Sequence, residues 1–205
     1  MTSMDLILLH GMGRTPLSMV ILQHRLKQLG YRAHLFGYSA TFESLNRVTN
    51  RLMALIHRLH TKNYGLIGHS LGAVIIRNAL PLLKQQPKVC FFLAPPMIAC
   101  KAAKVFSKLL PYRVLTGEMG QMLGQDGFMN QLVMPENVKI YGGTAGPRAA
   151  WLPLGDEIND GLLTIAEASG QFSQGVMRVP TLHSLIMNSK TVFEDMAIYL
   201  DKNCP

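Results

Sequence analysis

A serine lies at the centre of the segment Gly68-His69-Ser70-Leu71-Gly72, which matches the pattern G-x-S-x-G. An apolar run, residues 64–68, precedes the serine, and a segment with helical period follows it. In a sharp turn between a strand and a helix, a serine hydroxyl projects clear of the sheet, and flanking glycines remove side chains that would collide there. The pattern therefore predicts a nucleophile at Ser70. A serine that only caps a helix is the alternative.

Backbone amides near this serine are placed to stabilise negative charge on a substrate oxygen. A helix that begins at Leu71 points its free N–H groups toward that oxygen. The segment His10-Gly11-Met12-Gly13 follows the first predicted strand and is suited to bring the N–H of Met12 to the same place. We expect Met12 and Leu71 to form an oxyanion hole, which is the electrostatic core of acyl transfer. A plain glycine turn is the alternative for residues 10–13.

A serine hydroxyl is a weak nucleophile until a neighbouring imidazole removes its proton. Four of the seven histidines fall within predicted helices or strands: His24, His34, His57 and His60. His10 and His69 flank the amides and the serine in motif positions that point elsewhere. His183 follows the last predicted strand, residues 176–179, at the same edge of the sheet as the other loops. We therefore predict His183 as the general base, with an ordinary surface histidine as the alternative.

An imidazole that acts as a base needs a carboxylate to hold its tautomer. Asp156, Glu157 and Asp160 lie in the loop after the fifth predicted strand. Asn159-Asp160-Gly161 is a turn sequence, so Asp160 is expected on a tight turn that faces the histidine. Asp160 is the predicted orienting acid and Asp156 is the second candidate. The acid that has no such role would be a solvated turn residue.

These loops belong to a chain in which short apolar runs alternate with segments of helical period. Six runs are predicted strands: residues 5–10, 33–38, 64–68, 88–93, 138–141 and 176–179. Helices are expected from Thr15 to Gly30, over residues 45–62, after Ser70 and at the end of the chain. The alternation predicts a doubly wound parallel sheet of the α/β class, whose ligands bind beyond the carboxyl ends of the strands.

Regularity loosens over residues 97–136, which we interpret as an insertion or a looser helical layer over the site. Lys101–Leu110 is a predicted helix within it, with Lys101, Lys104 and Lys108 on one face and apolar residues on another. Such a basic amphipathic helix is suited to weak contact with an anionic lipid surface. A surface helix that packs on the sheet, with its lysines in water, is the alternative.

Composition excludes several classes of protein. The 205 residues suit a single domain spanning residues 1–205, and 48% hydrophobic with 16% charged residues argues against disorder. The net charge is +8, but the basic residues are scattered, so nucleic acid is not expected as a partner. Cys90, Cys100 and Cys204 are widely spaced, which disfavours a disulfide scaffold or a zinc site. With no signal peptide or membrane-spanning segment expected, a cytoplasmic location fits best.

Four sequence landmarks, in this order, resemble the α/β-hydrolase superfamily and, within it, the small bacterial lipases and esterases. They are Leu9–Gly13, Ile67–Ala73, Asn159–Leu162 and His183-Ser184, and the resemblance runs from about residue 5 to residue 200.

The resemblance implies an acyl-enzyme mechanism without a cofactor or metal, and ester-like substrates. By position it makes Ser70 the nucleophile, His183 the base and Asp160 the acid, and Met12 and Leu71 the oxyanion donors. His10, Gly11, Gly68, His69 and Gly72 would support these motifs. The chain departs from larger members because its oxyanion loop comes by residue 10 and the stretch after Pro96 is too short for a large cap domain.

The sequence therefore predicts a serine carboxylester hydrolase that acts on a small-molecule or lipid ester. A thioesterase, an amidase or an acyltransferase is an alternative, because one acyl-enzyme serves all four activities. A catalytically silent member that binds a hydrophobic ligand or partner is another alternative, and the complete set of Ser70, Asp160 and His183 argues against it. A module that binds anionic surfaces is suggested by the net charge alone.

Overall fold

Six parallel strands form one sheet in a computed structural model that describes residues 4–172 and 175–203. The strand order is β2-β1-β3-β4-β5-β6. The strands are β1 (Asp5–Leu9), β2 (Arg32–Phe36), β3 (Tyr64–His69), β4 (Val89–Leu93), β5 (Val138–Gly143) and β6 (Val176–Val179). Each begins within one residue of its predicted start, and the predicted doubly wound α/β sheet is confirmed.

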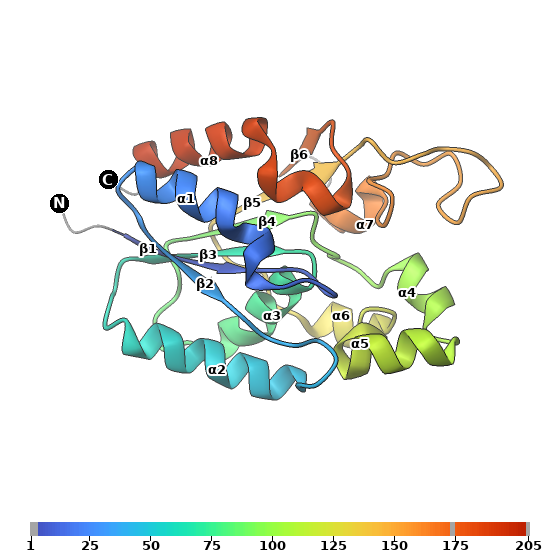
Figure 1. Cartoon of the computed structure of the whole chain (residues 1–205), viewed down its shortest axis with the longest axis horizontal. Coiled ribbons are helices and arrows are strands. Elements are labelled where there is room, and N and C mark those ends of the chain that lie inside the picture. The colour runs from blue at the N-terminus through green and yellow to red at the C-terminus, as the bar shows by residue number, and fades with distance from the viewer. Residues whose placement is uncertain (1–3, 173–174, 204–205) are drawn as a thin grey trace.

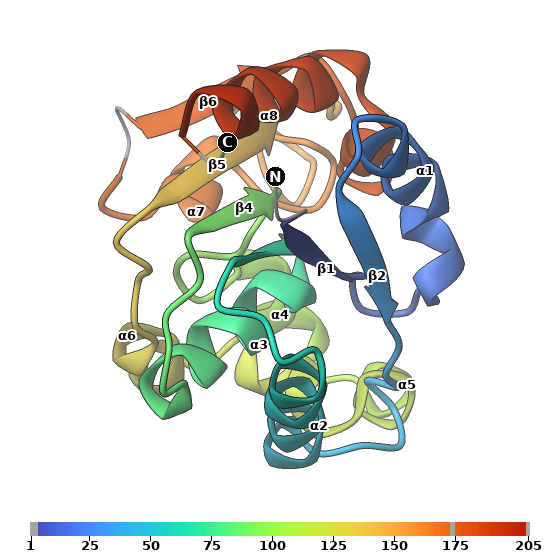
Figure 2. The ribbon, with the colours of Figure 1, turned by 90° about the vertical axis from the view of Figure 1, so that its left-hand side faces the viewer.

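Helices cover both faces of this sheet (Figures 1 and 2). One face carries α1 (Val20–Gln28) and α8 (Lys190–Asn203), and the other carries α2 (Leu45–Arg58) and α3 (Leu71–Ala79). The other helices lie toward the end of the sheet where the strands finish (Figure 1). They are α4 (Lys101–Phe106), α5 (Leu110–Met122), α6 (Asp126–Gln131) and α7 (Ile165–Ser169). Three short 3₁₀ segments complete the described elements: Pro16–Met19, Leu80–Leu82 and His183–Asn188.

The strand β1 shows why the central strands are continuously apolar. Its side chains alternate between the two faces of the sheet, so Leu6 and Leu8 pack in the core under α1 and α8. Ile7 and Leu9 pack in the core under α2 and α3. A parallel strand covered on both faces has no solvent side, and therefore no polar alternation in its sequence.

The predicted helix over residues 101–110 is wrong in its extent. The helix α4 ends at Phe106, and Leu109 is extended (φ −92°, ψ 127°) before α5 begins. Pro111 stands at the start of α5, where its missing N–H removes a bond that a continuous helix would need. Within α5 the backbone kinks at Gly117 (φ 57°). Lys108 therefore does not share one helix with Lys101 and Lys104.

The described residues also bear on the cysteines and on membrane insertion. Cys90 and Cys100 are buried free thiols, and Cys204 lies outside the described residues. Within residues 4–172 and 175–203, no helix combines the length and the apolar character needed to cross a bilayer.

A buried arginine joins α3 to the segment of residues 97–136. Arg77 is 4% exposed, and its guanidinium donates to the carbonyl oxygens of Met97 at 3.2 Å and Leu132 at 3.0 Å. Longer hydrogen bonds reach the carbonyls of Pro96, Met129 and Val133. Burial lowers the pKa of Arg77 to about 10, so the side chain stays protonated at neutral pH. This cation fixes the loops that cover the carboxyl edge of the sheet.

We predict that Arg77→Met lowers the free energy of unfolding by about 3 kcal/mol, because the buried carbonyls lose a charged donor. Urea unfolding followed by circular dichroism measures the change. Arg58→Met is the matched control, since Arg58 is an exposed residue of α2, and it should change the value by less than about 0.5 kcal/mol. Equal values for the two variants would contradict this role.

Candidate active site

The topology places two loops side by side at the carboxyl edge of the sheet. The chain leaves β1 for β2 on one side, then crosses to β3 on the other side of β1. At such a switch point the connections diverge and leave a crevice beyond the strand ends. Residues 10–13 follow β1, and Ser70 follows β3, so both loops open on this crevice.

Ser70 occupies the sharp turn between β3 and α3. Its backbone has φ 51° and ψ −117°, a conformation that residues with a side chain rarely adopt and that costs on the order of 1–3 kcal/mol. The N–H of Ser70 donates to the Leu93 carbonyl at 2.9 Å, and its carbonyl accepts from the N–H of Ala73 at 3.0 Å. The turn is thus held to β4 on one side and to α3 on the other.

Gly72 permits α3 to lie against the end of β1. A Cβ on Gly72 would lie 2.6 Å from the Leu9 carbonyl oxygen and 2.9 Å from that of His10. Both neighbours are backbone atoms, so neither can rotate away. The second glycine of the motif is therefore required by the close packing of α3 on β1 and the loop of residues 10–13.

The loop after β1 lies directly against the serine. A Cβ on Gly11 would lie 2.6 Å from His69 Nδ1 and 3.3 Å from Ser70 Cβ. Leu71 is the first residue of α3, where an N–H has no acceptor within the helix. Met12 lines the same cleft as Ser70. The two predicted oxyanion donors thus come from segments that border the serine.

The contacts of His10 hold the loop after β1 in place. Its ring is 1% exposed and stacks on Tyr38, with ring centroids 4.2 Å apart. Tyr38 donates its hydroxyl to the His10 carbonyl at 2.6 Å, and its N–H to Nε2 at 3.4 Å. Nδ1–H then donates to the Gly11 carbonyl at 2.9 Å. Burial lowers the pKa of His10, which keeps the ring neutral.

Asp160 and His183 meet through a buried hydrogen bond. His183 Nδ1 donates to Asp160 Oδ2 at 2.7 Å, and the side chains are 8% and 1% exposed. The other carboxylate oxygen, Oδ1, accepts from the N–H groups of Leu162 at 2.9 Å and Leu163 at 2.8 Å. The His183 N–H also donates to the Asp160 carbonyl at 2.9 Å. This geometry fixes the tautomer that leaves Nε2 free to accept a proton.

A buried asparagine fixes the loop that carries Asp160. Asn159 is fully buried, and its Nδ2 donates to the carbonyls of Pro147 and Glu157 at 3.0 Å and 2.9 Å. Its Oδ1 accepts from the N–H of Gly161 at 2.8 Å. The turn sequence at residues 159–161 predicts a tight turn. Nothing in it reveals that Asn159 also bonds to Pro147 and so holds the two ends of the loop of residues 147–159 together.

His69 supports the predicted base, a contact that its motif position does not suggest. His69 Nε2 donates to the His183 carbonyl at 3.0 Å, and the two rings lie 5.1 Å apart. Burial, and then the neighbouring His183, lower the pKa of His69 well below its usual value. His69 therefore stays neutral and adds no charge beside the base.

The helix α7 was not expected from the sequence, although a local signal for it exists. Thr164 and Glu167 form a capping box at its start, with the Thr164 side chain accepting from the Glu167 N–H at 3.1 Å. The Glu167 carboxylate also accepts a hydrogen bond from the Lys101 N–H, which attaches the start of α4 to α7. The spacing T-x-x-E is the signal that would have revealed this helix.

Ser70 and His183 line one small apolar cleft of about 100 Å³ together with Met12 and Cys100. Burial raises the pKa of the Cys100 thiol to about 12, so Cys100 is no competing nucleophile at neutral pH. Among the described residues Ser70 and His183 form no direct hydrogen bond. Catalytic hydrogen bonds are often long in ligand-free enzymes and close when substrate binds.

The remaining candidates lie away from this cleft. Asp156 is exposed, and Glu157 pairs with Lys101 at the surface. His24 is exposed on α1, and His34 pairs with Asp5 at 2.8 Å near the start of β1. Among residues 4–172 and 175–203, no group of three or more histidine, cysteine or acidic side chains is placed to hold a metal ion.

Comparison with known proteins gave no match to any protein-family model or curated protein. Solved structures do match over nearly the whole chain. The ydeN gene product from B. subtilis has a TM-score of 0.69 at 14% identity, covering 97% of this chain and 100% of that chain.

A lipase-esterase related protein from Clostridium acetobutylicum has a TM-score of 0.63 at 18% identity, covering 97% and 95% of the two chains. RedJ-thioesterase, from the prodiginine biosynthetic pathway in Streptomyces coelicolor, has a TM-score of 0.57 at 13% identity, covering 98% and 86%. The chain therefore has the α/β-hydrolase fold, in a compact version without a large cap domain.

We predict that Gly72→Ala lowers the free energy of unfolding by about 2 kcal/mol, because its Cβ would collide with two backbone carbonyls. Gly127→Ala is the control, since a Cβ there meets nothing within 4 Å and the residue lies in α6. Denaturant unfolding of the two variants measures the difference. If Gly72→Ala were as stable as Gly127→Ala, the close packing described for this turn would be wrong.

Proposed function

We propose that this chain is a serine carboxylester hydrolase, with Ser70 as nucleophile, His183 as general base and Asp160 as orienting acid. The observation that carries the proposal is the buried Asp160–His183 pair, whose histidine lines the same cleft as the strained Ser70. The α/β-hydrolase fold, shared with proteins described as lipase-esterase related and as a thioesterase, supports it.

In the proposed mechanism, His183 Nε2 accepts the Ser70 hydroxyl proton as Oγ bonds to the substrate carbonyl carbon. The electron pair of the carbonyl moves to its oxygen, where the N–H groups of Met12 and Leu71 donate to it. The carbonyl re-forms as the ester C–O bond breaks, and His183 gives the proton to the leaving alkoxide. Water then attacks the acyl-enzyme by the same steps, releasing the acid and restoring Ser70.

The surroundings of Ser70 favour an apolar substrate. A second cleft of about 200 Å³ adjoins the first, and Ala102, Phe106 and Leu162 line both. The loop that carries Pro147 and Leu154 forms the far side of the second cleft. An ester with an apolar chain would extend from Ser70 past Phe106, with its chain shielded from water on both sides.

A thioesterase is the second candidate activity, because thioester and ester cleavage share one acyl-enzyme. The similarity in fold to RedJ-thioesterase is the observation that keeps it open. The two activities differ in the leaving group, so matched ester and thioester substrates with the same acyl chain distinguish them.

We predict that a fluorophosphonate probe labels the wild-type protein at Ser70 and that Ser70→Ala abolishes the labelling. Ser70→Ala, His183→Ala and Asp160→Asn should each lower kcat on p-nitrophenyl esters by about 10³-fold, because the three residues act as a unit. Mass spectrometry locates the adduct, and absorbance follows hydrolysis.

Asp156→Asn is the control for this experiment, since Asp156 is an exposed acid of the same loop. It should leave kcat within about twofold of the wild-type value. Labelling that persists in Ser70→Ala would exclude Ser70 as the nucleophile. A larger loss in Asp156→Asn than in Asp160→Asn would reassign the acid.

We also propose that residues 105–115 contact an anionic lipid surface near the cleft. This segment exposes large apolar side chains, each at least 39% accessible: Val105, Phe106, Leu109, Leu110, Val114 and Leu115. Lys108 and Arg113 lie within it and form no ion pair among the described residues. Lys101 and Lys104, in contrast, pair with Glu157 and Asp126. Apolar side chains flanked by free cations are typical of surfaces that bind anionic membranes.

We predict that the protein sediments with vesicles of phosphatidylcholine and phosphatidylglycerol, and much less with phosphatidylcholine alone. Leu110→Ser with Val114→Ser should weaken this partition by about tenfold, because both side chains leave water on binding. Leu29→Ser with Ile198→Ser is the control, since Leu29 is exposed at the end of α1 and Ile198 is exposed on α8. Equal losses in the two double variants would count against this contact surface.

A further inference from the structure

A hollow larger than the cleft at Ser70 lies at the opposite end of the sheet. Its volume is about 410 Å³, and it lies between the last turns of α2, the start of β3 and the segment of residues 82–85. Figure 1 shows α2 finishing at the end of the sheet where β1 begins, whereas α4 and α5 lie at the other end. The volume is within the range of small-molecule binding sites, of roughly 300–1,000 Å³.

The lining of this hollow combines apolar side chains with two lysines. Met53, Ile56, Leu82 and Leu83 supply apolar surface, and Leu82 is 56% exposed. Lys62 and Lys84, both exposed, line the hollow together with His57 and His60, and no acidic side chain among the described residues lines it.

Hydrogen bonds hold the two lysine-bearing segments next to each other. Gln85 Nε2 donates to the Lys62 carbonyl at 2.6 Å, and the Tyr64 hydroxyl donates to the Gln85 carbonyl. The loop that carries Lys84 is therefore fixed to the turn that carries Lys62. Within the described part of the chain, neither lysine forms an ion pair with a carboxylate.

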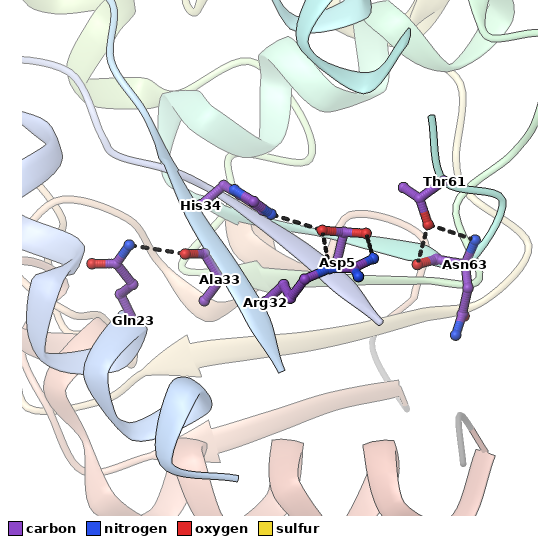
Figure 3. Close-up of polar contacts among 7 residues, drawn as sticks. All are labelled: Asp5, Gln23, Arg32, Ala33, His34, Thr61 and Asn63. Carbon is purple, nitrogen blue, oxygen red and sulfur yellow. Dashed lines mark hydrogen bonds and ion pairs between the residues drawn. The ribbon is translucent and has the colours of Figure 1, made fainter. Parts of the chain in front are cut away.

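The Asp5 carboxylate, next to the turn that carries Lys62, already pairs with other residues. Asp5 lies beside this turn, where its N–H donates to the Asn63 carbonyl at 3.1 Å. Figure 3 shows the Asp5 side chain between Arg32 and His34, with Thr61 and Asn63 next to it. Burial raises the pKa of Asp5, but the hydrogen bonds and charge of Arg32 and the bond from His34 outweigh it and lower the pKa below 3.8. The charge of Asp5 is thus matched without Lys62 or Lys84.

The end of α2 determines where an anion would lie. The last carbonyls of a helix carry partial negative charge, which disfavours an anion on the helix axis and is balanced by Arg58 in the last turn. An anionic head group is therefore favoured near Lys62 and Lys84. Met53 and Leu83 line the same hollow and offer apolar contacts.

We propose that this hollow binds an amphipathic monoanion, with its apolar chain against Met53, Ile56, Leu82 and Leu83 and its head group beside Lys62 and Lys84. Among the described residues, no serine or cysteine lines the hollow. The proposal does not depend on ester hydrolysis at Ser70.

The test is a titration of ¹⁵N-labelled protein with sodium dodecanoate, below the concentration at which it forms micelles. We expect amide shifts in residues 53–62 and 82–85. Dodecan-1-ol, which has the same chain without the charge, should bind more weakly, and sodium acetate should cause no shift. Shifts confined to residues that line the Ser70 cleft would overturn the proposal.

Charge-reversal variants give an independent measurement. Lys62→Glu with Lys84→Glu should weaken dodecanoate binding by about tenfold, because the head group loses both cations. Lys27→Glu with Lys202→Glu changes the net charge equally at exposed sites on α1 and α8, and should alter the affinity by less than about twofold. Thermal melts confirm that both variants are folded. Equal weakening, or binding of anionic vesicles in place of the monomer, would contradict the assigned site.

Discussion

The backbone of Ser70 occupies a conformation that glycine adopts easily and serine does not, with φ 51° and ψ −117°. The cost is on the order of 1–3 kcal/mol, and the surrounding sheet and helix must supply it. They do so through the hydrogen bond to Leu93 and through the packing that Gly72 permits against Leu9. The strained turn places the hydroxyl beyond the strand ends and starts α3 at the next residue. The cleft and the proposed roles of the Met12 and Leu71 amides and of His183 all depend on that geometry.

The second requirement is that loops far apart in sequence reach this turn. β5 and β6 pair in parallel, so the loops that follow them, with Asp160 and His183, emerge at one edge of the sheet. The 2.7 Å hydrogen bond between the two side chains joins these loops, and His69 ties the His183 main chain to the Ser70 turn. The N–H groups of Leu162 and Leu163 donate to the buried Asp160 side chain and compensate part of the cost of its burial. The arrangement is pre-organised around the imidazole before any substrate binds.

The sheet could be predicted from the sequence because its strands are buried on both faces and therefore appear as continuous apolar runs between helical segments. Parallel strands also place the loops after β5 and β6 at one edge of the sheet, so the sequence alone could predict that Asp160 pairs with His183. The prediction of one helix over residues 101–110 was wrong because the apolar spacing continues across Leu109, although Pro111 prevents one continuous helix. The contact of His69 with the His183 carbonyl depends on tertiary packing, which no local pattern carries.

The central claim is that the Ser70 hydroxyl, the His183 imidazole and two backbone amides act on one substrate carbonyl. A crystal structure of the protein phosphonylated on Ser70 tests it most directly, because the adduct mimics the tetrahedral intermediate. We expect one phosphonyl oxygen within about 3 Å of the amide nitrogens of Met12 and Leu71, with His183 Nε2 beside Oγ. An adduct whose phosphonyl oxygen points away from both amides, or one in which His183 remains out of reach of Oγ, would contradict it.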